Sequence, residues 1–128
     1  MEIPKNVVTI SRDIALQMTR TLLLERSGYS VTALGSDASV REFLRRPHQP
    51  QPNLVLMCHS VPEASRVALC NAIKFRFPTA PILMLYNSYD PTTTAKVDGA
   101  VANMTDPEAF LDTVQLLLSP KAGRASLN

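Results

Sequence analysis

The chain has no tryptophan, and only 4 phenylalanines and 3 tyrosines occur among its 128 residues. Proteins that bind single-stranded nucleic acid stack bases on aromatic side chains, for which this sequence offers few candidates. Excess positive charge is also missing, because the formal net charge of +2 comes from Lys121 and Arg124 near the C-terminus. The rest of the chain is close to neutral and lacks a basic footprint, so we expect no nucleic-acid partner.

Glycine, cysteine and long apolar runs are scarce as well. None of the 4 glycines forms a Gly-rich cradle after a strand, which disfavours an enzyme of flavodoxin-like fold and any phosphate-bearing cofactor. The 2 cysteines make no disulfide framework and favour a reducing compartment. The longest apolar runs, such as Leu54–Cys58, cannot span a bilayer, and Met1–Asn6 does not resemble a signal peptide. We therefore expect a cytoplasmic protein without membrane contact.

What the sequence does contain is an alternation of strand-like and helix-like segments. Short apolar or β-branched runs predict strands at residues 7–10, 29–34, 53–58, 82–86 and 100–103. Apolar spacing of three to four residues predicts helices from 14 to about 27, from 36 or 37 to about 46, from about 64 to 75, and from 107 to about 118. The length suits one domain, residues 1–118, followed by a flexible tail at 119–128.

Helix ends and faces follow from the same pattern. Asp13 is the expected N-cap of the first helix and Gly28 its stop, while Asp106 and Pro107 open the last helix. The apolar face of the first helix is predicted to bury Ile14, Ala15, Met18 and Leu22. The other helices are predicted to bury Val40, Phe43, Leu44, Val67, Cys70, Ile73, Phe110, Leu111, Val114 and Leu118.

Alternating strands and helices predict an α/β fold, with a parallel sheet covered by helices on both faces. Right-handed crossovers favour the flavodoxin-like strand order 2-1-3-4-5. In such a sheet the carboxyl ends of the strands gather at one edge, where ligands and catalytic groups usually lie. The candidate site residues at this edge are Ser11, Arg12, Asp13, Cys58, His59, Tyr86, Asn87 and Asn103.

Five short motifs, in this order and spacing, resemble the receiver domain of bacterial two-component response regulators (CheY-like). They are Leu22–Val31, Pro52–Met57, Val61-Pro62, Ala80–Leu85 and Asp106–Leu111. The resemblance covers roughly residues 5–118. It implies the flavodoxin-like fold and a place in two-component signal transduction or a phosphorelay, with a sensor kinase or an output protein as partner.

The residues with which this family performs its chemistry are replaced here. The two acids that hold Mg²⁺ fall on Ser11 and Arg12, and the phosphoacceptor aspartate falls on Cys58. The strand-four Ser/Thr falls on Tyr86 and the strand-five lysine on Asn103. Mg²⁺ prefers hard oxygen ligands, and phosphoryl transfer needs groups that neutralise the transferred charge. The resemblance thus implies a pseudo-receiver, not an enzyme, which needs no metal or cofactor and acts by protein–protein interaction.

The stretch from Tyr86 to Ala100 is shorter than the family usually has. This predicts that the family's fourth helix is a stub or absent. The threonine-rich residues 90–97 give the weakest structural signal of the chain and allow one or two helical turns. Receiver domains often dimerise or pass on their signal through the surface that this helix shares with strand five and the last helix. The sequence leaves a homodimer open.

Cys58 allows two interpretations. Beside His59 and Arg12, its thiol could have a lowered pKa and serve as a redox or nitrosylation sensor. Alternatively, it fills as a small apolar residue the space of the family's carboxylate. A metal site at Cys58 and His59 is disfavoured, because adjacent strand residues point to opposite faces.

The arginines also leave alternatives open. Arg12 either pairs with Asp13 or another acid and locks the pocket, or it is solvated. The cluster of Arg41, Arg45 and Arg46 could bind an acidic partner, or it could simply match the dipole of the helix that it ends.

Overall fold

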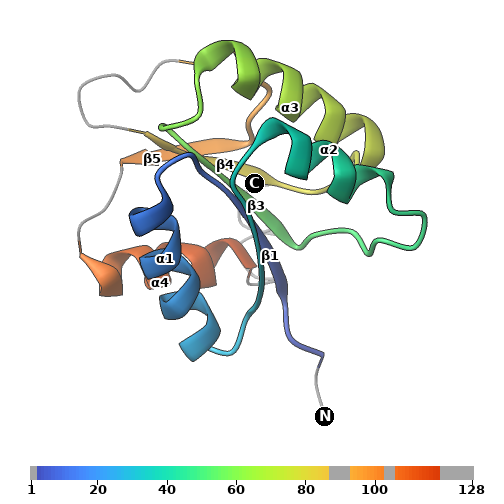
Figure 1. Ribbon diagram of the computed structural model, residues 1–128. Coiled ribbons are helices and arrows are strands. Elements are labelled where there is room, and N and C mark those ends of the chain that lie inside the picture. Colours follow the sequence, from blue (N-terminus) through green and yellow to red (C-terminus); the bar gives the residue numbers. More distant parts are fainter. Residues whose placement is uncertain (1–2, 87–92, 103–105, 119–128) are drawn as a thin grey trace, which may run out of the picture.

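Five strands form one parallel sheet in the order β2-β1-β3-β4-β5 (Figure 1). The computed structural model describes residues 3–86, 93–102 and 106–118. The strands are β1 (Asn6–Ile10), β2 (Ser30–Leu34), β3 (Leu54–Cys58), β4 (Ile82–Tyr86) and β5 (Gly99–Ala102). The predicted fold class and strand order are confirmed, and each strand lies where its apolar run predicted it.

In the part of the chain that the structure describes, four helices cover the two faces of this sheet. They are α1 (Ile14–Arg26), α2 (Asp37–Arg45), α3 (Glu63–Arg76) and α4 (Pro107–Leu118). Figure 1 shows α1 and α4 on one face and α2 and α3 on the other. None of the helices in the described ranges is long and apolar enough to cross a membrane.

Strand β3 is buried on both sides, which explains why its sequence is a continuous apolar run rather than an alternating one. Leu54 and Leu56 belong to the core cluster under α1 and α4. Val55 and Met57 belong to the cluster under α2 and α3. A strand in this position carries its last side chain, Cys58, into the interior at the carboxyl edge of the sheet.

The caps of α1 and α2 explain where these helices begin and end. Asp13 caps α1, since its side chain accepts a hydrogen bond from the Leu16 amide at 3.0 Å. Ser36 caps α2 through a capping box with Ser39. Of the two residues that the sequence offered for the start of this helix, Ser36 is the N-cap and Asp37 is the first helical residue. Gly28 follows α1 with a φ of 95°, a left-handed conformation that favours glycine.

The predicted buried face of α1 is wrong. Ile14, Met18 and Leu22 are 72%, 61% and 55% exposed, and Ala15 is exposed too. The residues that face the sheet are Gln17, Arg20 and Leu24. The predicted faces of the other helices are confirmed, with Leu44, Val67, Leu111 and Leu118 only partly buried.

Hydrogen bonds to the sheet explain the orientation of α1. The Gln17 side-chain amide donates to the carbonyl oxygens of Thr9 and Leu34, each at 3.0 Å, at the carboxyl ends of β1 and β2. Arg20 donates to the Cys58 sulfur at 3.3 Å. Buried polar groups need such partners, so the side of α1 that can satisfy the strand ends turns inward. An apolar stripe of Ile14, Met18 and Leu22 is left on the outside.

The connection from β4 to β5 lacks a helix in its described part, residues 93–98, which agrees with the predicted loss of helix four. Ala95 is buried and Val97 packs against the core under α2 and α3, so a segment without regular secondary structure covers the sheet here. At its far end, the Asp98 carboxylate accepts hydrogen bonds from the Lys74 ammonium and the Ile82 amide, each at 2.7 Å.

Glu63, the first residue of α3, holds the near end of this segment. Its carboxylate accepts hydrogen bonds from the Thr94 amide at 2.7 Å and from the Thr93 and Thr94 hydroxyls at 2.9 and 3.0 Å. It also forms an ion pair with Arg66. The Thr94 amide is the largest influence on the carboxyl group and, with the hydroxyls and Arg66, lowers the pKa of Glu63 to about 2.

Replacing Glu63 with alanine is expected to release residues 93–95 and to speed hydrogen exchange of the Thr94 amide by about tenfold. Because the folded-state pKa lies below the ordinary 4.5, the stabilisation is complete above pH 4.5 and is lost as the pH falls toward about 2. Amide exchange followed by NMR measures both effects. Glu108→Ala, in the first turn of α4, is the matched control, and equal protection of Thr94 in both variants would contradict the prediction.

Candidate functional site

The carboxyl ends of β1 and β3 are joined by a serine that was not among the predicted site residues. The Ser60 hydroxyl oxygen accepts hydrogen bonds from the backbone amides of Arg12, at 2.8 Å, and Asp13, at 3.3 Å. It also lies 3.2 Å from the hydroxyl of Ser11, which is itself buried. The loops after β1 and β3 are thus held together by hydroxyl groups and backbone amides.

Arg12 pairs with an acid from another element. Its guanidinium forms an ion pair with Asp37 at the start of α2, and Asp37 also accepts a hydrogen bond from the Ser65 hydroxyl at 3.0 Å. Asp13 has the separate task of capping α1. The pairing of Arg12 with an acid other than Asp13 was one of the sequence alternatives. Since both side chains are about one-third exposed, the ion pair orients the loop more than it stabilises the fold.

Cys58 lies beneath this link and is almost fully buried, with 1% of its surface exposed. The guanidinium of Arg20, itself only 5% exposed, donates to the sulfur at 3.3 Å. His59 contributes Nδ1 at 3.7 Å from the same sulfur. The expectation that Cys58 and His59 point apart is therefore wrong, because β3 ends at Cys58 and the strand alternation does not continue to His59.

The two cysteines of the chain are both buried, yet the pKa values of their thiols shift in opposite directions. Burial, the largest influence, raises the pKa of Cys70 to about 11. Burial is also the largest single influence on Cys58 and by itself raises its pKa. There, however, hydrogen bonds from Ser60, Arg20 and Ser11 together outweigh burial and lower the pKa below the ordinary 9.0. The surroundings of Cys58 therefore favour a thiolate.

Tyr86, another of the predicted residues, does not join this cluster. Tyr86 ends β4 and packs against the core under α2 and α3, and no hydrogen bond within the described ranges links it to Cys58 or Ser60. Asn87 and Asn103 lie outside the residues that the structure describes. Of the predicted set, the structure brings together Ser11, Arg12, Asp13, Cys58 and His59.

Sequence reasoning missed Arg20 and Ser60. Arg20 carried a signal, because it is the only charged residue between Asp13 and Glu25, in a segment otherwise suited to burial. Its spacing of three and four residues from Gln17 and Leu24 also places it on their face of the helix. Ser60 carried no such signal, since serine is common in the loops that follow strands.

The side chains that the structure describes at this edge do not fit Mg²⁺. The hydroxyls of Ser11 and Ser60 and the thiol of Cys58 are poor ligands for a hard cation, and the described carboxylates of Asp13 and Asp37 cap α1 and pair with Arg12. In the described part of the chain, no three His, Cys, Asp or Glu side chains gather closely enough to hold a metal ion. Instead, the guanidinium groups of Arg12 and Arg20 place positive charge at this edge of the sheet.

The architecture is that of the response-regulator receiver domain. The chemotaxis response regulator CheY4 of Vibrio cholerae is similar with a TM-score of 0.74 at 16% identity, over 90% of this chain and 99% of that one. A response regulator from Thermotoga maritima gives 0.74 at 18% identity, over 91% and 98%. The HemR receiver domain from Leptospira biflexa gives 0.73 at 18% identity, over 90% and 94%. At these identities the likeness shows the CheY-like fold. No protein-family model and no curated protein matches the chain.

Proposed function

We propose that this chain is a cytoplasmic pseudo-receiver, a non-enzymatic signalling module that acts through a protein partner without aspartyl phosphorylation. The observation that carries the proposal is the hydrogen-bonded link at the ends of β1 and β3. At the positions of the family's metal-binding acids and phosphoacceptor stand Ser11, Arg12 and Cys58, and Ser60 already uses the backbone amides there. A sensor kinase or an output protein is the expected class of partner.

The chemistry of phosphoryl transfer supports this conclusion. The family's transfer needs a carboxylate acceptor and a metal ion that neutralises charge on the moving group. Here the acceptor position is a buried thiol held by Arg20, and Arg12 is committed to Asp37. A partner that binds such a domain must recognise its surface rather than a change in the pocket. The exposed apolar stripe of Ile14, Met18 and Leu22 on α1 is consistent with an interaction surface.

Incubation with acetyl phosphate and Mg²⁺ is expected to add no phosphoryl mass to the intact chain. Beryllofluoride with Mg²⁺ is expected to leave the amide NMR spectrum unchanged, because no carboxylate at the end of β3 can receive it. Mass spectrometry and NMR measure the two results, with a parallel sample lacking Mg²⁺ as control. A covalent phosphoryl adduct, or amide shifts spreading from Cys58 to α4, would overturn the proposal.

A second candidate function is a thiol switch at Cys58, favoured by the 3.3 Å contact from Arg20 and the lowered pKa of the thiol. In this scheme the thiolate attacks a peroxide, an S–O bond forms as the O–O bond breaks, and hydroxide leaves with the second oxygen. The 1% exposure of Cys58 opposes it, since the oxidant must reach the sulfur. The rate of peroxide oxidation decides the matter: a Cys58 rate no faster than that of Cys70 removes this candidate.

A further inference from the structure

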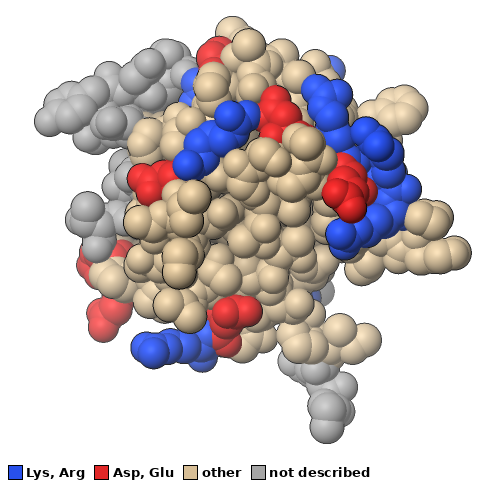
Figure 2. Space-filling view, viewed as in Figure 1, with Lys and Arg blue, Asp and Glu red and all other residues tan. Residues whose placement is uncertain are grey.

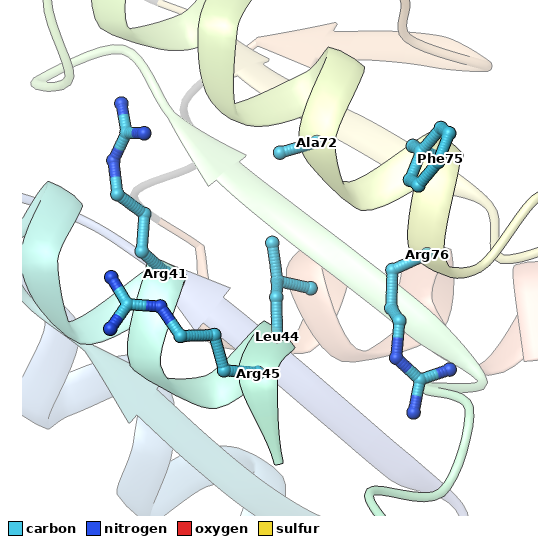
Figure 3. A pocket seen from close by; sticks show the side chains of 6 residues that line it. All are labelled: Arg41, Leu44, Arg45, Ala72, Phe75 and Arg76. Atoms are coloured by element: carbon cyan, nitrogen blue, oxygen red, sulfur yellow. The ribbon is translucent and has the colours of Figure 1, made fainter. Parts of the chain in front are cut away.

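A groove of about 400 Å³ lies between α2 and α3, on the face of the sheet opposite to α1. Its lining residues are Arg41, Leu44 and Arg45 from α2 and Ala72, Phe75 and Arg76 from α3. Figure 3 shows Leu44 and Ala72 facing one another across the groove, with the arginines at its margins. The floor is thus apolar and the rim is cationic.

Phe75 is the most exposed aromatic side chain that the structure describes, with 91% of its surface accessible. It sits beside the half-buried Leu44 and Ala72, so the apolar surface of the floor continues onto the exposed ring. Contiguous apolar surface of this kind, rimmed by polar groups, marks sites where another molecule binds. An aromatic residue at the mouth of a groove is also a common anchor of protein–protein contacts.

The positive charge at this groove is not neutralised within the domain. Arg41, Arg45 and Arg46 are exposed, and none of the salt bridges among the described residues includes them or Arg76. Figure 2 shows Lys and Arg side chains gathered on the side of the molecule where α2 and α3 lie together. The only acid on α2 beyond its first turn is Glu42. The local charge is therefore strongly positive.

Helix dipoles explain only part of this arrangement. Arg45 and Arg76 lie in the last turns of α2 and α3, where a cation stabilises the helix end. Arg41 lies in the middle of α2, where the dipole gives no such benefit. Arg76 is also held in place at the rim, since its guanidinium carbon lies 4.6 Å from the Phe77 ring centroid and it donates to the Arg46 carbonyl at 3.5 Å.

We propose that this groove binds an acidic amphipathic helix of a partner protein, with Leu or Phe side chains seated between Leu44, Ala72 and Phe75 and with Glu or Asp side chains facing the arginines. Helix-in-groove binding uses this combination of an apolar floor with flanking charge. A nucleic acid would use the arginines but would leave the apolar floor without a partner. An acidic amphipathic peptide uses both.

The inference goes beyond the proposed function, because the groove lies apart from the linked ends of β1 and β3. Phosphorylation of the chain would overturn the pseudo-receiver proposal and leave the groove as it is. Conversely, absence of peptide binding at the groove would not change the proposal that Ser11, Arg12 and Cys58 prevent phosphorylation. Each experiment therefore tests one of the two proposals only.

The probe is a fluorescent amphipathic peptide helix of about five turns, with Leu and Phe along one side and Glu on both flanks. Fluorescence anisotropy with the complete chain measures its dissociation constant. Arg41→Glu combined with Arg45→Glu is expected to weaken binding by at least about tenfold, and Phe75→Ala by about fivefold. Raising the salt concentration is expected to weaken binding further.

Arg26→Glu is the matched control for Arg45→Glu, since both arginines end a helix and only Arg45 lines the groove. It is expected to leave peptide affinity unchanged, and all variants lie at exposed positions where the fold tolerates change. Absence of peptide binding, or equal binding of a scrambled peptide of the same composition, would overturn the proposal. Tighter binding of a DNA duplex or of phosphatidylserine vesicles, lost in the Arg41 and Arg45 variant, would reassign the groove and overturn it as well.

Discussion

Replacing Leu24 with alanine is expected to lower the free energy of unfolding by about 3 kcal/mol, whereas Leu22→Ala is expected to change it by less than about 0.5 kcal/mol. The two leucines lie on the same helix and lose the same atoms. Leu24 is completely buried against the cluster that contains Val7, Leu54 and Leu56. Leu22 is 55% exposed and packs against nothing that its truncation would leave as a cavity.

Urea denaturation followed by circular dichroism measures the difference, provided that both variants unfold with the same denaturant dependence. The pair works as its own control, because helix propensity changes equally at the two positions. A larger loss for Leu22→Ala would mean that α1 presents to the sheet the apolar face that its spacing predicted. Equal losses in the free energy of unfolding would mean that α1 has no preferred face toward the sheet.

The strands were predictable because each is a short apolar run bounded by proline, glycine or polar residues. Leu54–Cys58 and Ile82–Tyr86 have five apolar or aromatic residues in succession, which suits a strand covered on both faces. Crossover chirality then restricts the strand order to few alternatives. The helix caps at Asp13, Ser36 and Asp106 were recognisable because an acceptor side chain precedes each helical run.

The orientation of α1 was not predictable from spacing, because apolar residues occur around much of this helix. Choosing the longest apolar stripe, Ile14 to Leu22, gives the wrong face. The orientation of α1 is instead fixed at the strand ends, where the carbonyl groups of Thr9 and Leu34 accept hydrogen bonds from the Gln17 side chain. A sequence does not show which distant backbone groups a helix side chain can reach, and a buried Gln17 amide without such partners would cost free energy.

The location of the candidate site in the fold was predictable from the sequence, but the contacts between its side chains were not. The convergence of strand ends places Ser11, Arg12 and Cys58 at one edge of the sheet, because topology alone fixes that edge. It did not reveal that Arg20 reaches the sulfur from the middle of a helix, or that the Ser60 hydroxyl joins the two loops. Both contacts depend on side-chain directions that the strand order leaves undetermined.

Arg20→Met is expected to raise the pKa of the Cys58 thiol, because burial raises this pKa and one of the hydrogen bonds that lower it is lost, while those of Ser60 and Ser11 remain. Methionine keeps a similar volume but removes the donor that lies 3.3 Å from the sulfur. The ultraviolet absorbance of the thiolate, followed against pH in a Cys70→Ser background, measures the shift. Arg12→Met is the control, because it removes a guanidinium that pairs with Asp37.

The same substitution is expected to weaken the pH dependence of the free energy of unfolding. In the parent chain the folded thiol loses its proton before the unfolded one, so the free energy of unfolding rises with pH from the folded pKa to 9.0 and then levels off. In Arg20→Met the folded pKa lies closer to 9.0, so the rise in the free energy of unfolding begins at a higher pH and is smaller. Denaturant midpoints between pH 7 and 10 would show whether the two slopes differ. If they coincide, the hydrogen bonds from Ser60 and Ser11 rather than the one from Arg20 lower the pKa of Cys58.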